Sequence, residues 1–227
     1  MPVDKDVMID ATDVNKEYRR AGAIIRALAD INLTIRAGEF VVIQGPTGCG
    51  KSTLLNVLSG LDLPNSGKII FDGENIARAT ETRLAKIRRQ KVGMVFQDFN
   101  LIKTLTAVEN VESMLRPTVL SNKEIENRAI AALRDVNMLE RKDHFPVEMS
   151  GGEKQRIAIA RAIVGKPRVI FADEPTGNLD PESENQILEL LKEINRNYET
   201  TILCVSHRNS VTKFGDRTIK MDNGRIV

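Results

Sequence analysis

Residues 45–53 carry the feature that most limits how this chain can fold. They are GPTGCGKST, a glycine-rich loop that follows the apolar run FVVIQ and precedes helix-forming sequence. The backbone N–H groups of such a loop can turn inward, and a helix that begins there points its positive end at the same spot. Phosphate oxygens are the natural occupant. We therefore expect a strand, a phosphate-binding loop and a helix in immediate succession.

The loop predicts a nucleotide site that includes a Mg²⁺ ion. Lys51 is expected to reach the β- and γ-phosphates and the Ser52 hydroxyl to ligate the metal, while Thr53 begins the helix interior. A chance glycine loop is the alternative, and the strand before it and the helix after it argue against that. The predicted nucleotide-binding residues here are Gly45, Pro46, Thr47, Gly48, Cys49, Gly50, Lys51, Ser52 and Thr53.

A second segment, RVIFADEP at 168–175, ends an apolar strand with two acids. Asp173 is placed to join the Mg²⁺ shell, and Glu174 follows where a base can orient and deprotonate water. Adjacent acids at a strand end are otherwise often solvated caps. With the phosphate loop present, we favour ATP hydrolysis.

Further apolar runs predict the fold class. Residues 91–96, 168–172 and 200–206 are short runs typical of strands buried on both faces, and they alternate with helical sequence. Alternating strands and helices imply a parallel α/β sheet. Residues 7–71 also favour strands, apart from the helix after the phosphate loop. From about residue 98 to residue 166 the pattern changes to helix.

Two helices have clear sequence signals. Ser121 with Glu124 is a capping-box pattern. Asp180 is the expected N-cap of a helix that opens at Pro181. Its apolar residues Ile187, Leu190, Leu191 and Ile194 recur at helical spacing, so one face packs on the sheet.

Composition narrows the partners and the compartment. Thirty-three basic residues against thirty-one acidic ones leave a net charge of +2 without a basic tract, and aromatic content is 4% with no Trp, so no nucleic-acid partner is expected. Cys49 and Cys204 lie far apart, as in a protein of the reducing cytosol. No stretch approaches eighteen apolar residues, so we expect a cytoplasmic protein without a membrane span.

Five more segments then fall into the order of the ATP-binding cassette (ABC) ATPases, which the whole chain resembles. Tyr18 lies where that family stacks an aromatic ring on adenine, Gln97 resembles its Q-loop glutamine, and His207 its switch histidine. Residues 149–156, MSGGEKQR, resemble the family signature, and residues 178–180, NLD, its D-loop. The signature has MSGGE where LSGGQ is usual, and no catalytic group is missing.

The resemblance implies the architecture and the cofactors. It implies one ABC domain over 1–227, with a RecA-like phosphate-loop core and an antiparallel β subdomain in about 1–97 and 167–227, and an inserted helical subdomain in about 98–166. It also implies ATP rather than GTP. Glu174, His207 and Gln97 would be catalytic, and Ser52, Gln97 and Asp173 would hold Mg²⁺.

Each of these residues has a plainer alternative. Tyr18 alone is more often a strand-edge aromatic, Gln97 a surface amide and His207 a structural histidine. Ser150 and Glu153 also have the pattern of a capping box, and this segment can both cap a helix and serve as the family signature.

By resemblance, two copies pair head to tail as an ATP-dependent homodimer. Each ATP then lies between one phosphate loop and four residues that the other copy provides in trans, namely Ser150, Gly151, Gly152 and Asp180. A two-fold arrangement makes that contact isologous.

The purpose of hydrolysis has two candidate answers. The first is a transport ATPase, peripheral on the cytoplasmic face of the membrane, that drives separately encoded permease subunits. The second is a non-transport ABC protein acting on DNA, the ribosome or a membrane-anchored division machinery. Residues 101–111 and 173–180 most resemble the lipoprotein-releasing, macrolide-exporter and division branch. A nucleotide kinase would leave the signature and His207 without a role.

The same resemblance predicts where a membrane partner docks. By resemblance, residues 97–111 contact its coupling helices, through apolar side chains crowded after Gln97. At least half of these are also expected in the core of the helical insert. They are Phe99, Leu101, Ile102 and Leu105.

Overall fold

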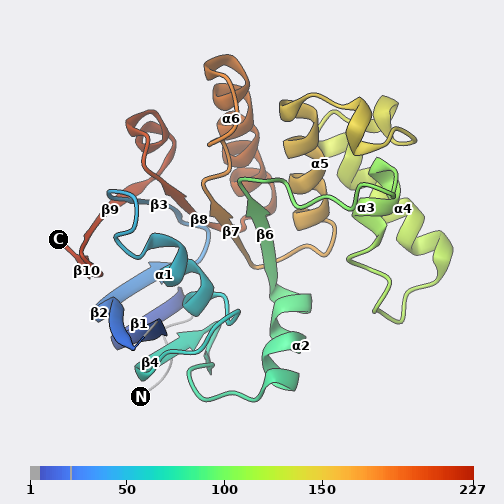
Figure 1. Cartoon of the computed structure of the whole chain (residues 1–227). Coiled ribbons are helices and arrows are strands. Elements are labelled where there is room, and N and C mark those ends of the chain that lie inside the picture. Colours follow the sequence, from blue (N-terminus) through green and yellow to red (C-terminus); the bar gives the residue numbers. More distant parts are fainter. Residues whose placement is uncertain (1–5, 21) are drawn as a thin grey trace.

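Two β-sheets organise the chain in the computed structural model, which describes residues 6–20 and 22–227 (Figure 1). The first sheet is antiparallel and has the strand order β2-β1-β4-β5. Its strands are β1 (Val7–Arg20), β2 (Ala23–Arg36), β4 (Ser66–Phe71) and β5 (Glu74–Asn75).

The second sheet contains the strands predicted from buried apolar runs. Its order is β10-β9-β3-β8-β7-β6, and all neighbours are parallel except β10, which pairs antiparallel with β9. The carboxyl ends of the parallel strands therefore share one edge. The strands are β3 (Phe40–Gln44), β6 (Val92–Phe96), β7 (Val169–Asp173), β8 (Thr201–Ser206), β9 (Arg217–Asp222) and β10 (Arg225–Ile226).

This sheet is covered on both faces, which explains its continuous apolar strands. Phe40 and Val42 point into one core cluster, and Val41 and Ile43 point into another on the opposite face. The first cluster joins the sheet to α5 and α6, and the second joins it to α1 and the antiparallel sheet. Successive residues of β3 therefore contact the layers that pack on opposite faces of the sheet.

The helices lie around both sheets (Figure 1). α1 (Lys51–Leu58) packs in the core between the two sheets, and α6 (Pro181–Tyr198) packs on the other face of the parallel sheet. The insert contributes α3 (Ala107–Glu112), α4 (Asn122–Asp135) and α5 (Gly151–Ile163), all within the predicted helical segment; α2 (Glu81–Lys91) lies before β6. Short 3-10 helices are η1 (Leu139–Arg141), η2 (Pro146–Glu148) and η3 (Asn209–Phe214).

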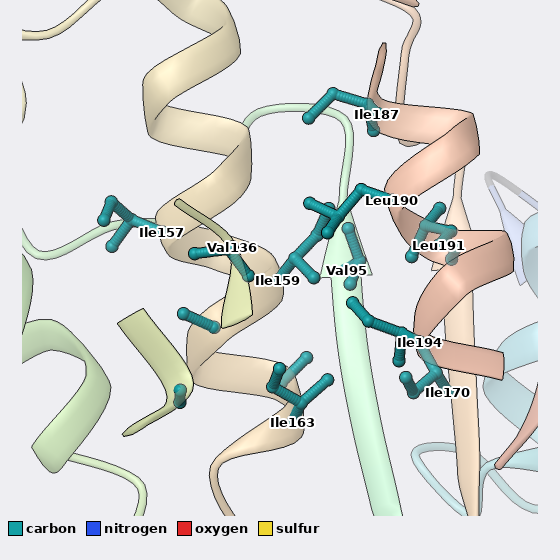
Figure 2. Packing of buried hydrophobic residues seen from close by; sticks show 14 of the residues in the cluster. Val95, Val136, Ile157, Ile159, Ile163, Ile170, Ile187, Leu190, Leu191 and Ile194 are labelled. Carbon is teal, nitrogen blue, oxygen red and sulfur yellow. The ribbon is translucent and has the colours of Figure 1, made fainter. Parts of the chain in front are cut away.

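Helix signals in the sequence are confirmed. Ser121 and Glu124 form the capping box of α4, and Asp180 accepts hydrogen bonds from the N–H groups of Glu182 and Ser183 at the start of α6. Figure 2 shows the apolar face of α6 directed at α5 and β6. Its residues Ile187, Leu190, Leu191 and Ile194 are at most 4% exposed.

Several elements escaped sequence prediction, among them α2, β9 and β10. α2 has only two buried residues, Leu84 and Ile87, among charged neighbours, so its apolar spacing is too sparse to detect. The strand expected at 91–96 begins one residue later, because Lys91 is the last residue of α2. β9 and β10 were also missed, since only Ile219 and Met221 of β9 are buried. In the described residues, no helix is both long and apolar enough to cross a membrane.

Candidate functional site

The phosphate loop lies between the carboxyl end of β3 and the start of α1, where the sequence predicted it. Gly50 precedes the helix with φ of 104°, and a Cβ there would lie 2.3 Å from the carbonyl oxygen of Ala27. A Cβ on Gly45 would lie 2.2 Å from the carbonyl oxygen of Met221. Both positions therefore require glycine, one for its backbone conformation and both for close contact with neighbouring strands.

Lys51 is folded onto the loop that precedes it. Its Nζ donates to the carbonyl oxygens of Gly45 and Pro46 at 2.8 and 2.9 Å, and the residue is only 5% exposed. The ammonium group thus has two neutral hydrogen-bond partners within the loop. An anion in the loop would give this buried charge a counterion.

Ser52 and Asp173 meet across the sheet edge. The Ser52 hydroxyl donates to Asp173 Oδ1 at 3.0 Å, so the two predicted metal ligands are adjacent although they are far apart in sequence. The pKa of Asp173 is raised above its ordinary value, mainly because the carboxyl group is buried. The nearby charge of Glu174 adds to this shift, whereas the hydrogen bond from Ser52 opposes it. A cation beside this carboxylate would counter the cost of its burial.

Glu174 and His207 form a second pair at the same edge. His207 Nδ1 lies 2.6 Å from Glu174 Oε2, and β7 and β8 are parallel neighbours that end beside each other. Glu174 has φ of 47°, so the chain turns sharply after β7 and directs this side chain out of the sheet. A positive φ is uncommon for glutamate, and such unusual backbone conformations are often found at functional sites.

A cavity of about 520 Å³ lies above the phosphate loop. Tyr18 lines it and is 37% exposed; its hydroxyl donates to Asp62 Oδ2 at 2.8 Å, and Lys16 Nζ lies 4.9 Å from the ring centre. Lys16 and Asp62 thereby fix the ring. The predicted residues that line this cavity are Tyr18, Thr47, Gly48, Gly50, Lys51, Ser52, Thr53 and Glu174.

Five further lining residues escaped sequence prediction. Ile25, Arg26 and Ala27 come from β2, where Ile25 is the cross-strand partner of Tyr18. Asn223 and Gly224 form the turn between β9 and β10, both with positive φ. An Asn-Gly pair is a strong hairpin signal, so this turn could have been found from sequence.

The other predicted loop and edge residues lie beside the cavity rather than in its lining. Cys49 is 5% exposed and belongs to the apolar core, and its N–H donates to the Pro46 carbonyl oxygen at 3.3 Å. Gln97 is exposed and donates to Asn178 Oδ1 at 3.0 Å. Asn178 donates in return to the Gln97 carbonyl oxygen at 3.2 Å. Gln97 is thus joined to the segment that follows Glu174.

The signature segment forms the predicted capping box at the start of α5. Ser150 Oγ accepts from the N–H of Glu153 at 3.2 Å, and Glu153 Oε2 accepts from the N–H of Ser150 at 2.8 Å. Among the described residues that line the cavity above the phosphate loop, none comes from this segment. A Cβ on Gly151 would lie 3.2 Å from Leu179, so the signature borders the D-loop.

The apolar residues after Gln97 divide as expected. Phe99 and Leu101 pack against the larger core cluster, whereas Ile102 is 47% exposed. Ile102 lines a second cavity, of about 540 Å³, between β6, α2 and the insert.

Comparisons with known proteins agree with this geometry. A family model described as ABC transporter matches residues 28–177. MJ1508, an uncharacterized ABC transporter ATP-binding protein of Methanocaldococcus jannaschii, is 44% identical over 97% of this chain and 98% of its own length. The macrolide export ATP-binding/permease protein MacB of Chlorobaculum tepidum is 40% identical over 97% of this chain, which covers 34% of MacB.

A solved structure resembles the fold closely. It is the dimeric, post-hydrolysis state of the ATP-binding cassette MJ0796 of Methanocaldococcus jannaschii bound to ADP and Pi. The two chains are 41% identical with a TM-score of 0.89, and the match covers 96% of each. The predicted phosphate-loop fold is confirmed. Since the family match extends from β2 through the phosphate loop to the segment after Glu174, this chain belongs to the ABC transporter family, among the ATP-binding proteins that hydrolyse ATP.

Proposed function

We propose that this chain powers a membrane transporter as a head-to-tail homodimer, and that its membrane-spanning subunits are separate chains. The observation that carries the proposal is the separation of two anion-binding features. The phosphate loop opens into a cavity to which the signature helix contributes no residue, although the capped N-terminus of α5 has its own unpaired N–H groups. A second copy can bring that N-terminus to the nucleotide.

The residues at the sheet edge fit ATP with Mg²⁺. The adjacent oxygens of Ser52 and Asp173 are the hard ligands that Mg²⁺ takes from a protein while it keeps water and phosphate oxygens. When bound, this ion neutralises charge on the phosphates. Lys51 and the loop amides hold the phosphates, and Tyr18 offers the free part of its ring to the adenine.

The paired side chains Glu174 and His207 carry the hydrolytic step in this proposal. Glu174 orients a water molecule and accepts its proton, because its carboxylate leaves the sheet beside the phosphate loop. His207 holds that carboxylate through Nδ1. In this proposal its ring also contacts the terminal phosphate. Gln97, attached to the segment after Glu174 through Asn178, completes the contacts to metal and water.

The membrane partner is proposed to dock beside Ile102. This side chain is exposed at the second cavity, which Met94 and Met114 also line. Methionine side chains adapt to differently shaped apolar partners. Docking there places the protein on the cytoplasmic face of a membrane. Resemblance to MacB, whose printed name joins the ATP-binding and permease parts, supports a transport role.

The test is the size in solution of Glu174→Gln with and without ATP and Mg²⁺. Loss of the base traps the nucleotide between two copies, so we expect an ATP-dependent shift from monomer to dimer. Adding Ser150→Arg should abolish the shift, because a bulky cation replaces the cap that faces the partner's nucleotide. Ser121→Arg is the matched control, since Ser121 caps a different helix, α4, with the same kind of box. A Glu174→Gln monomer that binds ATP tightly and never pairs would refute the dimeric site.

A further inference from the structure

Arg208 connects three segments of the site without lining the cavity itself. It follows His207 in the turn between β8 and η3. One end of its guanidinium, Nη1, donates to Glu184 Oε2 in α6, and the other end, Nη2, donates to the carbonyl oxygen of Gly177 at 3.2 Å. Its own N–H donates to Ser206 Oγ at 3.0 Å.

Glu184 is a buried anchor for this arginine. The residue is 5% exposed, and both of its carboxylate oxygens are used, Oε2 by Arg208 and Oε1 by the hydroxyl of Ser210. Removing one partner of such a buried pair would leave the other without compensation for its lost hydration. Because a guanidinium is a rigid planar fork, fixing one end on Glu184 also fixes the end that meets Gly177.

Gly177 contacts both Arg208 and the two proposed catalytic residues Glu174 and Gln97. Its N–H donates to the Glu174 carbonyl oxygen at 3.0 Å, which closes the turn that presents the Glu174 carboxylate. The Gln97 side chain packs directly on Gly177, with Nε2 only 2.8 Å from where a Cβ would lie. A shift of the Gly177 carbonyl therefore moves both Glu174 and Gln97.

We propose that Arg208, held by Glu184, is a positioning residue for ATP hydrolysis, one that sets the Gly177 turn relative to His207. The inference rests on the roles proposed above for Glu174, His207 and Gln97. Neither Arg208 nor Gly177 lines the nucleotide cavity among the described residues, so ATP binding does not depend on the link. The link acts on the catalytic rate.

The first test compares Arg208→Lys with Lys213→Met. A lysine keeps the charge beside Glu184 but has one nitrogen, which cannot occupy both ends of the fork. Lys213 Nζ also joins η3 to α6, through Asn185 Oδ1 at 3.2 Å, but contacts neither Gly177 nor the turn at His207, so it controls for loosening of η3. We expect kcat of Arg208→Lys to fall about 10- to 100-fold, as small misplacements of reacting groups do, with KM for ATP within about twofold of the parent. Lys213→Met should keep the parental kcat.

A second variant separates positioning from folding. Arg208→Met with Glu184→Met removes both charges at once and leaves no unpaired ion, a replacement that buried ion pairs often tolerate. We expect a melting temperature near that of the parent and a kcat as low as in Arg208→Lys. A kcat within about twofold of the parent in this folded double variant would overturn the proposal.

Glu174→Gln in the same assay tells the two failures apart. If Glu174→Gln is inactive and the double methionine variant is fully active, Arg208 has no positioning role and the catalytic assignment stands. If Glu174→Gln itself hydrolyses ATP at the parental rate, the proposed catalytic site is wrong.

Discussion

Gly177→Ala probes the link between Gln97 and the rest of the site with one methyl group. A Cβ at this position would lie 2.8, 2.9 and 3.1 Å from three atoms of the Gln97 side chain, whereas ordinary contact begins at 3.4 Å. The backbone φ of Gly177 is not positive, so alanine fits the turn itself. The methyl group must therefore displace the Gln97 amide, which then loses its 3.0 Å hydrogen bond to Asn178.

The stability and rate effects of this variant should differ. Loss of one hydrogen bond costs about 1 kcal/mol of unfolding free energy. The lower chain entropy of alanine in the unfolded state returns about 0.4–1 kcal/mol. The melting temperature should therefore change by no more than about 2–4 °C. A side-chain displacement of a fraction of an ångström at a reacting centre should lower kcat about tenfold, which corresponds to about 1.4 kcal/mol of activation free energy.

Steady-state ATP hydrolysis at saturating ATP, with a thermal melt of the same sample, measures both effects. Gly165→Ala is the control, because a Cβ there has only the Arg89 carbonyl oxygen within 4.0 Å and φ is not positive. Parental kcat in a folded Gly177→Ala protein would refute the role of Gln97. A melting temperature lower by more than about 10 °C would refute the packing argument.

Two further predictions concern the signature helix and the adenine site. Hydrogen bonds from Ser150 and the charge of Arg141 hold the pKa of Glu153 below 4.5, so its stabilisation is complete well above that pH and is lost as the pH falls through the lower folded-state pKa. Glu153→Gln should cost about 0.3–1 kcal/mol at pH 7, measured by urea unfolding, and this cost should shrink as the pH falls below 4.5; a cost independent of pH would contradict this. Tyr18→Ala should weaken ATP binding by about 1–3 kcal/mol, whereas Tyr18→Phe, which keeps the ring and loses only the hydroxyl with its bond to Asp62 and its contact with Thr53, should bind as the parent does by calorimetry; equal losses would exclude ring stacking.

Sequence patterns predicted the strands and helices whose buried apolar residues recur at regular spacing. The run at 200–206 is apolar because β8 lies between two covered faces, and its six residues are all buried. α6 was predicted from one buried face and an N-cap, both local signals. α2 was not predicted, because it contributes little apolar surface and its place depends on contacts made elsewhere in the chain.

In the site, too, local motifs were predicted and contacts between distant segments were not. The phosphate loop is contiguous, so its spacing identifies it, and the acids after β7 follow from the end of an apolar strand. Pairs such as Gln97 with Asn178 or Arg208 with Glu184 join segments whose proximity is set only by the order of strands in the sheet. Neither residue type nor spacing predicts such pairs. The roles assigned to the individual site residues remain predictions that the variants above can test.

The support of the phosphate loop by β9 and β10 has a consequence for synthesis. Gly45 has no room for a side chain because of Met221, and Gly224 donates its N–H to the Cys49 carbonyl oxygen at 2.9 Å. The ribosome makes Gly224 about 175 residues after Cys49, which at 5–20 residues per second is a delay of roughly 10–35 s. During that interval a nascent chain contains the complete loop sequence without the strands that brace it, so nucleotide can help folding only after β9 and β10 have been made.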